Sequence, residues 1–147
     1  MDALQLEQLV RTDIHASRYF CGVWAADELY RFKFPPHRKA VLIVNFSSRG
    51  YAGSHWVSIA WLPKKEKILY MDPAGINPSL HPDILHFILK HTIKSRCILL
   101  AHNIQHPGTS TCGWFCLCWV YCFARHWSLK RFSRLFTRDT KRNEDTI

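Results

Sequence analysis

The order of apolar and polar positions predicts several short buried strands. Residues 40–46, 55–62 and 67–71 are apolar runs rich in β-branched and aromatic side chains, and each has the length of a strand. The second and third runs are separated by Pro63-Lys64-Lys65-Glu66, which has the composition of a tight turn. We therefore predict an antiparallel meander of three strands, followed by a fourth strand at 96–101.

Three other segments have the pattern of helices. Apolar residues recur at helical spacing over 3–12 and, most clearly, over 81–94, where Pro82 suits a first-turn position. Residues 113–126 are apolar on all sides, which is typical of a helix buried on every face. Residues 19–24 are apolar without a clear period, so we predict irregular structure there.

The pattern as a whole indicates the α+β class. We predict one domain over residues 1–147, in which a mixed or antiparallel central sheet packs against the buried helix. The chain has 147 residues and is 48% hydrophobic, which suffices for one core. A short basic C-terminal tail, about 128–147, is predicted to hold one more amphipathic helix, with apolar positions at Leu129, Phe132, Leu135 and Phe136.

Composition narrows the environment and the partners. No apolar run of 18 residues free of charge occurs, so no membrane helix is expected. The first residues lack a secretory pattern, which indicates the cytosol or nucleus, where thiols stay reduced. The formal charge of +9 favours polyanions such as DNA or RNA as partners, although excess charge also serves solubility alone.

The six cysteines include four within eleven residues, and none forms a CxxC pair. Cys118, Cys122 and His126 follow one another at i, i+4 and i+8 and could share a helix face. A fourth ligand is not evident, so we expect these residues to pack in the core and predict no metal site.

Cys112 is the strongest candidate for chemistry. It follows Ser110-Thr111, a helix-capping pair, and therefore falls in the first turn of the buried helix. Unpaired N–H groups and the helix dipole stabilise a thiolate there, and the thiolate is the nucleophilic form of cysteine. Gly113 would let the backbone approach a substrate. The alternative is an inert structural thiol.

A nucleophilic cysteine needs a base, and the base needs an orienting partner. His55 opens one predicted strand, and Asp72 ends the next. If the two strands pair as a hairpin, both side chains meet at one edge of the sheet. Gln105 lies seven residues before Cys112, and its amide is the candidate donor to an oxyanion beside the Cys112 N–H. Each residue also has an ordinary structural interpretation.

The order His-Trp, Asp, Gln and Cys-Gly resembles the adenovirus-type cysteine proteases, or adenains, of the clan that includes the SUMO-specific proteases. The 17-residue spacing from His55 to Asp72 and the seven-residue spacing from Gln105 to Cys112 fit the adenovirus group. The similarity extends over roughly 19–128 and includes four motifs: Tyr19-Phe20-Cys21-Gly22-Val23, Gly53-Ser54-His55-Trp56, Tyr70-Met71-Asp72-Pro73 and Cys112-Gly113-Trp114-Phe115-Cys116.

The resemblance implies a papain-related fold and a cysteine endopeptidase. It would cleave viral precursor proteins at glycine-containing sites during virion maturation, in the host nucleus and the virion. The resemblance also implies catalytic roles for His55, Asp72, Gln105 and Cys112, with DNA and an activating viral peptide as cofactors. Cys97, in Arg96-Cys97-Ile98, is the position that would join such a peptide by a disulfide. We expect a monomer.

The chain departs from the adenoviral pattern in having Asp at position 72, often Glu in that group, and in ending 35 residues after Cys112. It therefore resembles a short, divergent viral member, in which part of the DNA and peptide surfaces is expected to be absent. Two alternatives remain open. One is a SUMO or ubiquitin-like deconjugating protease, and the other is a non-enzymatic nucleic-acid-binding protein that uses the basic tail.

Overall fold

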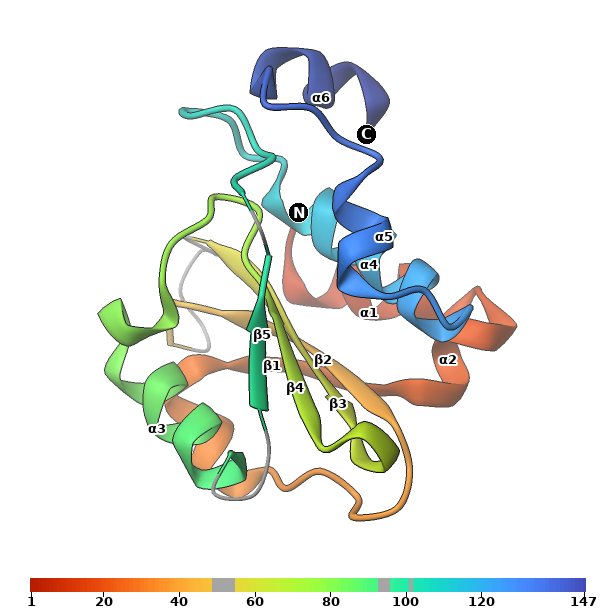
Figure 1. The fold of residues 1–147 in the computed structure, drawn as a ribbon, viewed down its shortest axis with the longest axis vertical. Helices are drawn as coiled ribbons and strands as arrows, with labels where there is room; N and C mark the ends of the chain where they lie inside the picture. Colours follow the sequence, from red (N-terminus) through yellow and green to blue (C-terminus); the bar gives the residue numbers. More distant parts are fainter. Residues whose placement is uncertain (49–54, 93–95, 101) are drawn as a thin grey trace.

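The computed structural model describes residues 1–48, 55–92, 96–100 and 102–147 (Figure 1). It is an α+β fold around one five-stranded sheet with the order β1-β2-β3-β4-β5. The strands are β1 (Phe20–Ala25), β2 (Ala40–Asn45), β3 (Trp56–Leu62), β4 (Lys67–Met71) and β5 (Arg96–Leu99). The α-helices are α1 (Ala3–Arg11), α2 (Ile14–Tyr19), α3 (Pro82–His91), α4 (Cys112–Ala124), α5 (Leu129–Ser133) and α6 (Thr140–Thr146).

Each face of the sheet has its own core. On one face, α1, α2, α4 and α5 pack against residues such as Val41, Ile43 and Met71. On the other face, α3 and the 3-10 helix η1 (Ala26–Arg31) pack against the alternate strand residues, including Leu42 and Val44. Residues of β2 are buried on both sides, which explains its continuous apolar run.

The predicted meander is confirmed. β2 and β3 pair antiparallel, as do β3 and β4, with Ser58 opposite Met71 in the second pair. A short 3-10 helix η2 (Pro63–Lys65) makes the turn, and Glu66 completes it in the left-handed conformation. β3 begins at Trp56, so His55 lies just outside the strand that we predicted it would open.

The segment 19–24 is not irregular as predicted. It ends α2 and forms the edge strand β1, which pairs parallel to β2. The register shifts between Phe20 and Val23, and Gly22 has a φ of 108°. A bulge of this kind removes the alternation by which a strand is recognised from sequence. β5 also pairs parallel, to β4, so the sheet is mixed.

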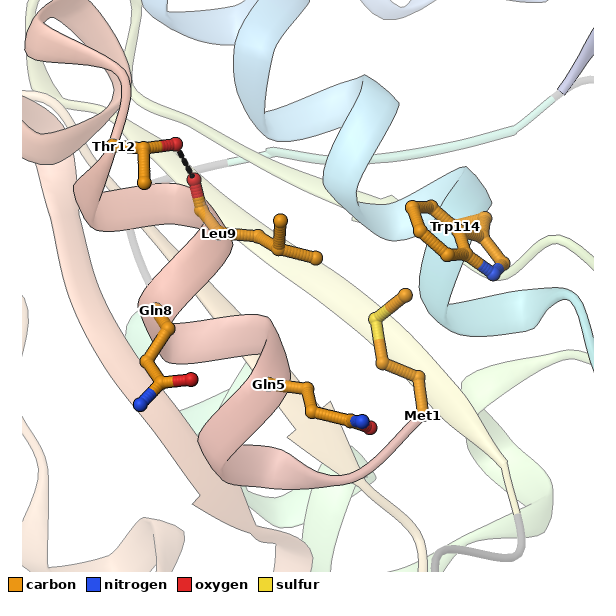
Figure 2. A pocket seen from close by; sticks show the side chains of 6 residues that line it. All are labelled: Met1, Gln5, Gln8, Leu9, Thr12 and Trp114. Atoms are coloured by element: carbon orange, nitrogen blue, oxygen red, sulfur yellow. Dashed lines mark hydrogen bonds between the residues drawn. The ribbon is translucent and has the colours of Figure 1, made fainter.

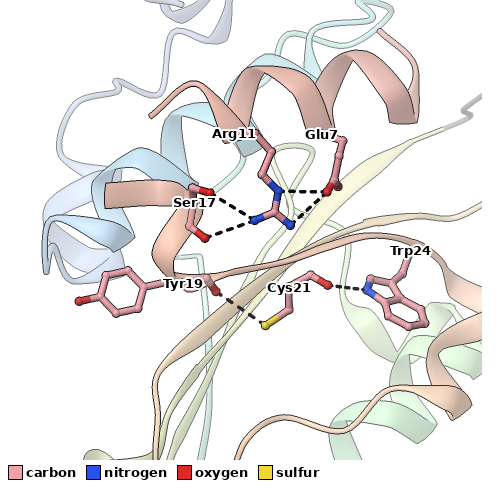
Figure 3. Close-up of polar contacts among 6 residues, drawn as sticks. All are labelled: Glu7, Arg11, Ser17, Tyr19, Cys21 and Trp24. Carbon is pink, nitrogen blue, oxygen red and sulfur yellow. Dashed lines mark hydrogen bonds and ion pairs between the residues drawn. The ribbon is translucent and has the colours of Figure 1, made fainter. Parts of the chain in front are cut away.

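Polar contacts tie the two N-terminal helices together and fix the approach to β1 (Figure 3). Arg11 bonds Glu7 at 3.1 Å within α1 and donates to both the carbonyl and the hydroxyl of Ser17 on α2. Asp13 caps α2 by accepting from the Ala16 N–H. The two short helices therefore form one corner, on which α4 rests.

The buried helix 113–126 is confirmed as α4, and Cys116, Cys118 and Cys122 pack with the core on its face of the sheet. Lys39 caps its C-terminal end by donating to the Phe123 carbonyl at 2.8 Å. Of the helices in the described segments, none is long and apolar enough to cross a membrane.

The tail differs from the prediction of a single helix. α5 and α6 are separate, and Asp139 starts α6 as an N-cap that accepts from the Arg142 N–H. Leu129, Phe132 and Phe136 are buried as expected, but Leu135 is 43% exposed. The C-terminal ends predicted for the 81–94 helix and the 96–101 strand fall outside the described residues at 93, 94 and 101.

Candidate active site

The hairpin of β3 and β4 brings His55 and Asp72 together, as the sequence predicts. His55 Nε2 lies 2.6 Å from Asp72 Oδ1. His55 immediately precedes β3 and Asp72 immediately follows β4, and antiparallel pairing places these two ends at the same sheet edge. The imidazole is thereby held by one ring nitrogen, which leaves Nδ1 free to face another group.

Asp72 is almost fully buried, with an exposed fraction of 2%. Its Oδ1 also accepts from the Ala74 N–H at 2.8 Å, so one oxygen is fixed by two donors. Its Oδ2 is buried without a hydrogen-bond partner among the described residues. The bond from Ala74 forms an Asx turn, which orients the carboxylate independently of its contact with His55.

Cys112 is the first residue of α4, the helix packed on one face of the sheet, and its side chain reaches the same place. The backbone N–H of Trp56 donates to its sulfur at 3.4 Å, which puts the thiol beside the strand that His55 precedes. Burial opposes ionisation of this thiol. Hydrogen bonding and charge from His55, together with the N–H groups of Trp56 and Gly113, outweigh that effect and lower the pKa of Cys112.

His55 shows the reciprocal effect. Burial disfavours the charged imidazolium, but hydrogen bonds to Asp72 and Cys112, and the negative charges there, raise the pKa of His55 to about 9. A raised imidazole pKa and a lowered thiol pKa together favour a thiolate–imidazolium pair at neutral pH. The ring also stacks edge to face with Phe46 at 4.9 Å, which restricts its rotation.

Gln105 is buried near this site, at 8% exposure, but its amide has another partner. Its Nε2 donates to the carbonyl of Thr109 at 3.0 Å and to the Thr109 hydroxyl at 3.2 Å. The backbone N–H groups of Ile104 and Gln105 both donate to the Pro73 carbonyl, so this loop is attached to the turn after Asp72. An amide donor turned toward Cys112 would have to release one of its bonds to Thr109.

The start of α4 differs from expectation in its capping. Thr111 occupies the N-cap position, but its side chain makes no cap bond and its hydroxyl donates to Glu144 instead. A Cβ at Gly113 would lie 3.4 Å from Trp56 and 3.6 Å from Leu6, which are ordinary van der Waals contacts, so packing does not require glycine there. Glu144 and Phe46 were not identified from sequence, since neither belongs to a local motif.

A cavity of about 510 Å³ lies between α1 and the first turn of α4 (Figure 2). The side chains that line it are uncharged and belong to Met1, Gln5, Gln8, Leu9, Thr12 and Trp114. Trp56 connects this hollow to the site, because its indole N–H donates to the Met1 carbonyl while its backbone N–H reaches Cys112. The hollow is therefore a neighbour of the thiol.

Cys97 lies apart from these residues, half-buried on the edge strand β5. Burial raises the pKa of the Cys97 thiol. Cys116 is fully buried, and burial raises its pKa further. Among the described residues, no group of three His, Cys, Asp or Glu side chains is arranged to hold a metal ion.

The site places a thiol at a helix start beside an imidazole, which in turn contacts a buried carboxylate. This arrangement on a mixed-sheet α+β fold defines a class of proteins with a cysteine nucleophile. The sequence profile of the adenovirus endoprotease family matches residues 20–140. The chain belongs to this family.

Individual relatives agree with that membership. The chain is 29% identical over 133 residues to the protease of human adenovirus B serotype 3, covering 84% of this chain and 62% of that protein. It is 26% identical over 144 residues to the protease of bovine adenovirus 2, covering 92% and 68%. The chain thus spans a little under two thirds of the length of the human adenovirus relative.

Solved structures share the fold at low sequence identity. An ASFV protease aligns with a TM-score of 0.64 at 17% identity, covering 97% of this chain and 64% of that one. The SUMO protease Ulp1 aligns with a TM-score of 0.57 at 14% identity, covering 92% and 73%. The predicted fold class, a mixed sheet packed on a helix that begins at the cysteine, is therefore confirmed.

Proposed function

We propose that this protein is a cysteine endopeptidase with Cys112 as its nucleophile. The observation that carries the proposal is the convergence of Cys112, His55 and Asp72 from three separate elements. The 2.6 Å contact from His55 to Asp72 and the Trp56 contact to the Cys112 sulfur fix their relative position. Family membership agrees with this chemistry.

The reaction begins from the thiolate of Cys112, which attacks the carbonyl carbon of a peptide bond. The His55 imidazolium then gives its proton to the leaving amine, and an acyl chain remains on the sulfur. His55, now neutral, takes a proton from a water molecule, which attacks the acyl carbon and releases the acid. Asp72 holds the ring by Nε2 throughout and stabilises its positive charge.

The oxyanion of each tetrahedral intermediate needs donors that are fixed in advance. We assign the backbone N–H of Cys112 and the side-chain amide of Gln105 to this role. Since both hydrogens of the Gln105 amide point to Thr109, one of them would turn to the oxyanion when substrate is bound.

The substrates are proposed to be viral precursor proteins, cleaved at glycine-containing sites during virion maturation in the host nucleus and the virion. The support is the family and its adenoviral relatives, each named as a protease. A glycine beside the scissile bond also suits a thiol that is only 6% exposed, because a glycine has no side chain to exclude.

The test is cleavage of an extended glycine-containing peptide by purified protein. The wild type should cleave it, and Cys112→Ala should lose at least about 10³-fold in kcat, as for other removed nucleophiles. Cys118→Ala, which removes a half-buried thiol from the same helix, is the matched control and should retain activity. Full activity in Cys112→Ala would exclude the proposed mechanism.

DNA and an activating peptide are proposed as cofactors on different parts of the surface. The basic side chains of the tail are exposed and suit a polyanion: Arg125, Lys130, Arg131, Arg134, Arg138, Lys141 and Arg142. Cys97 is the proposed attachment point for the peptide, and its raised pKa means that disulfide exchange there is slow at neutral pH. Cleavage rates measured with and without each cofactor test both assignments.

The same peptide assay, run beside a reporter in which a folded ubiquitin-like modifier is the acyl group, separates the two protease alternatives. Cleavage of the peptide supports an endopeptidase, whereas cleavage of the modifier reporter alone supports a deconjugating enzyme. A protein that only binds nucleic acid would cleave neither. The buried Phe132 and Phe136 argue against a base-stacking surface on the tail.

A further inference from the structure

The C-terminal helix α6 presents a carboxylate to the loop that precedes the nucleophile. Three donors converge on one oxygen, Glu144 Oε1. They are the His106 backbone N–H at 2.8 Å, the Thr109 hydroxyl at 2.9 Å and the Thr111 hydroxyl at 3.1 Å. Charge-assisted hydrogen bonds of this kind are stronger than neutral ones and fix geometry.

Each of these contacts lies next to a group that the reaction uses. Thr109 accepts the Gln105 amide through both its carbonyl and its hydroxyl. Thr111 is the N-cap of α4, and its carbonyl accepts from the N–H groups of Trp114 and Phe115, so it sets the first turn that carries Cys112. One carboxylate thus contacts the residue before the thiol and the residue that holds the oxyanion amide.

Glu144 is distinct from the contacts that attach α6 to the molecule. Asn143 is 1% exposed, and its amide donates to the carbonyls of Ile104 at 3.1 Å and Thr137 at 2.7 Å. His106 Nδ1 lies 3.0 Å from the hydroxyl of Thr140 at the start of the helix. These bonds hold the helix in place, so the Glu144 carboxylate can be removed while α6 stays docked.

We propose that Glu144 is a positioning residue that holds the 105–111 loop, and with it the Gln105 amide, in the geometry needed to stabilise the oxyanion. The proposal rests on the cysteine-protease function assigned above. Glu144 touches neither the thiol nor the imidazole in this arrangement, and it acts through Thr109 on Gln105. The Thr109 hydroxyl has one proton and three acceptors within reach: the His106 carbonyl at 2.7 Å, Glu144 Oε1 at 2.9 Å and the Thr111 hydroxyl at 3.1 Å. Loss of Glu144 therefore removes the acceptor that connects this hydroxyl to α6.

The experiment compares Glu144→Ala with Asp145→Ala, which removes an exposed carboxylate from the next position of the same helix. Glu144→Ala should lower kcat by about 10- to 100-fold, since misplacing a reacting group by an ångström has effects of that size. KM should change by less than about threefold, and Asp145→Ala should match the wild type. Alkylation of Cys112 by iodoacetamide, which forms no oxyanion, should stay within about twofold of wild type in both variants.

A double variant tests the route of the effect. If Glu144 acts through Gln105, the pair Gln105→Ala and Glu144→Ala together should lose no more kcat than Gln105→Ala alone. The proposal is overturned if Glu144→Ala keeps wild-type kcat, if its alkylation rate falls as far as its kcat, or if the two losses multiply. Failure of the protease assignment itself would look different, because the wild type would then not cleave or Cys112→Ala would.

Discussion

At the scale of single residues, the site depends on partners that outweigh burial. Cys112 and His55 are both largely buried, which on its own would keep the thiol and the imidazole neutral. For Cys112, the contact with His55 and the backbone N–H groups of Trp56 and Gly113 reverse that outcome. For His55, the contacts with Asp72 and Cys112 do so. Cys97 is half-buried and Cys116 is fully buried, and burial raises the pKa of both thiols instead.

The first prediction concerns the pH dependence of alkylation. A lowered thiol pKa means that Cys112 stays a thiolate at pH values where an ordinary cysteine is protonated, so its alkylation should continue at lower pH than that of an ordinary cysteine. Cys97, with its raised pKa, should react only at higher pH. Iodoacetamide labelling of each site between about pH 5 and 10, measured by mass spectrometry, tests this. Parallel pH profiles for the two thiols would contradict it.

The second prediction concerns Asp72→Asn. The amide keeps an oxygen for His55 and Ala74 but loses the charge, so the pKa of His55 should fall from about 9. The upper limit of the pH–rate profile should therefore move to lower pH, because the imidazolium needed by the leaving amine is lost earlier. We expect kcat to fall by about 10- to 100-fold, less than for the nucleophile. An unchanged upper limit would show that Asp72 does not set the charge of His55.

At the scale of elements, the site lies where β3 and α4 begin, β4 ends and the 104–105 segment passes. The β3–β4 hairpin supplies His55 and Asp72, α4 supplies Cys112, and the 104–105 backbone is hydrogen-bonded to Pro73. Gly75 closes this arrangement with a φ of 70°, and a Cβ there would lie 2.9 Å from the Asn103 side chain and 3.2 Å from its backbone. The turn after Asp72 and the loop before Cys112 are therefore in direct contact.

The third prediction follows from that contact. Gly75→Ala should destabilise the protein by roughly 1 to 2 kcal/mol for the left-handed backbone and about 1 to 3 kcal/mol more for the crowding against Asn103. Gly108→Ala is the matched control, because Gly108 has a φ of 81° and none of the described residues lies within 4 Å of its added Cβ. Urea denaturation of both variants measures the difference. Equal losses of unfolding free energy in the two variants would mean that crowding against Asn103 does not contribute to the destabilisation.

Elements with strong local patterns were predictable from sequence, and those set by distant contacts were not. The meander, α4 and the meeting of His55 with Asp72 follow from periodicity and from hairpin geometry. β1 was not predicted because its bulge at Gly22 breaks the alternation of apolar and polar residues. The tail was predicted as one helix, but Asp139 starts a second one. The partner of Gln105 lies only four residues away, but in a loop without a regular period. The contacts of Glu144 span 33 to 38 residues, which no local pattern records.

At the scale of the whole molecule, two hydrophobic cores enclose one sheet from opposite faces. Helices α1, α2, α4 and α5 cover the face that carries Cys112, while η1 and α3 cover the other (Figure 1). The formal charge is +9, and many of the basic side chains are exposed on α5, α6 and the segment between these helices. Arg131 lies over the ring of Trp127 at 3.8 Å, so this face of the indole is not free for a base.

The fourth prediction concerns the proposed DNA surface. Replacing Arg134 and Arg138 with alanine should weaken binding to duplex DNA and lower the slope of log K against log salt by about 1 for each phosphate that is no longer neutralised. Replacing Lys64 and Lys65, exposed at the distant β3–β4 turn, removes the same charge and should leave the slope nearly unchanged. Equal effects of the two double substitutions would mean that DNA binding depends on the net charge of the protein and not on the tail.

The most direct test is to locate the acyl group during turnover. The protein is mixed with an activated ester of a peptide that ends in glycine, quenched in acid within the first turnover, digested and analysed by mass spectrometry. A thiol nucleophile at position 112 predicts one acyl group per molecule, attached to Cys112, and none in His55→Ala on the same time scale. An acyl group found on Cys116, Cys118 or Cys122 instead, or turnover with no acylated cysteine, would contradict the assignment.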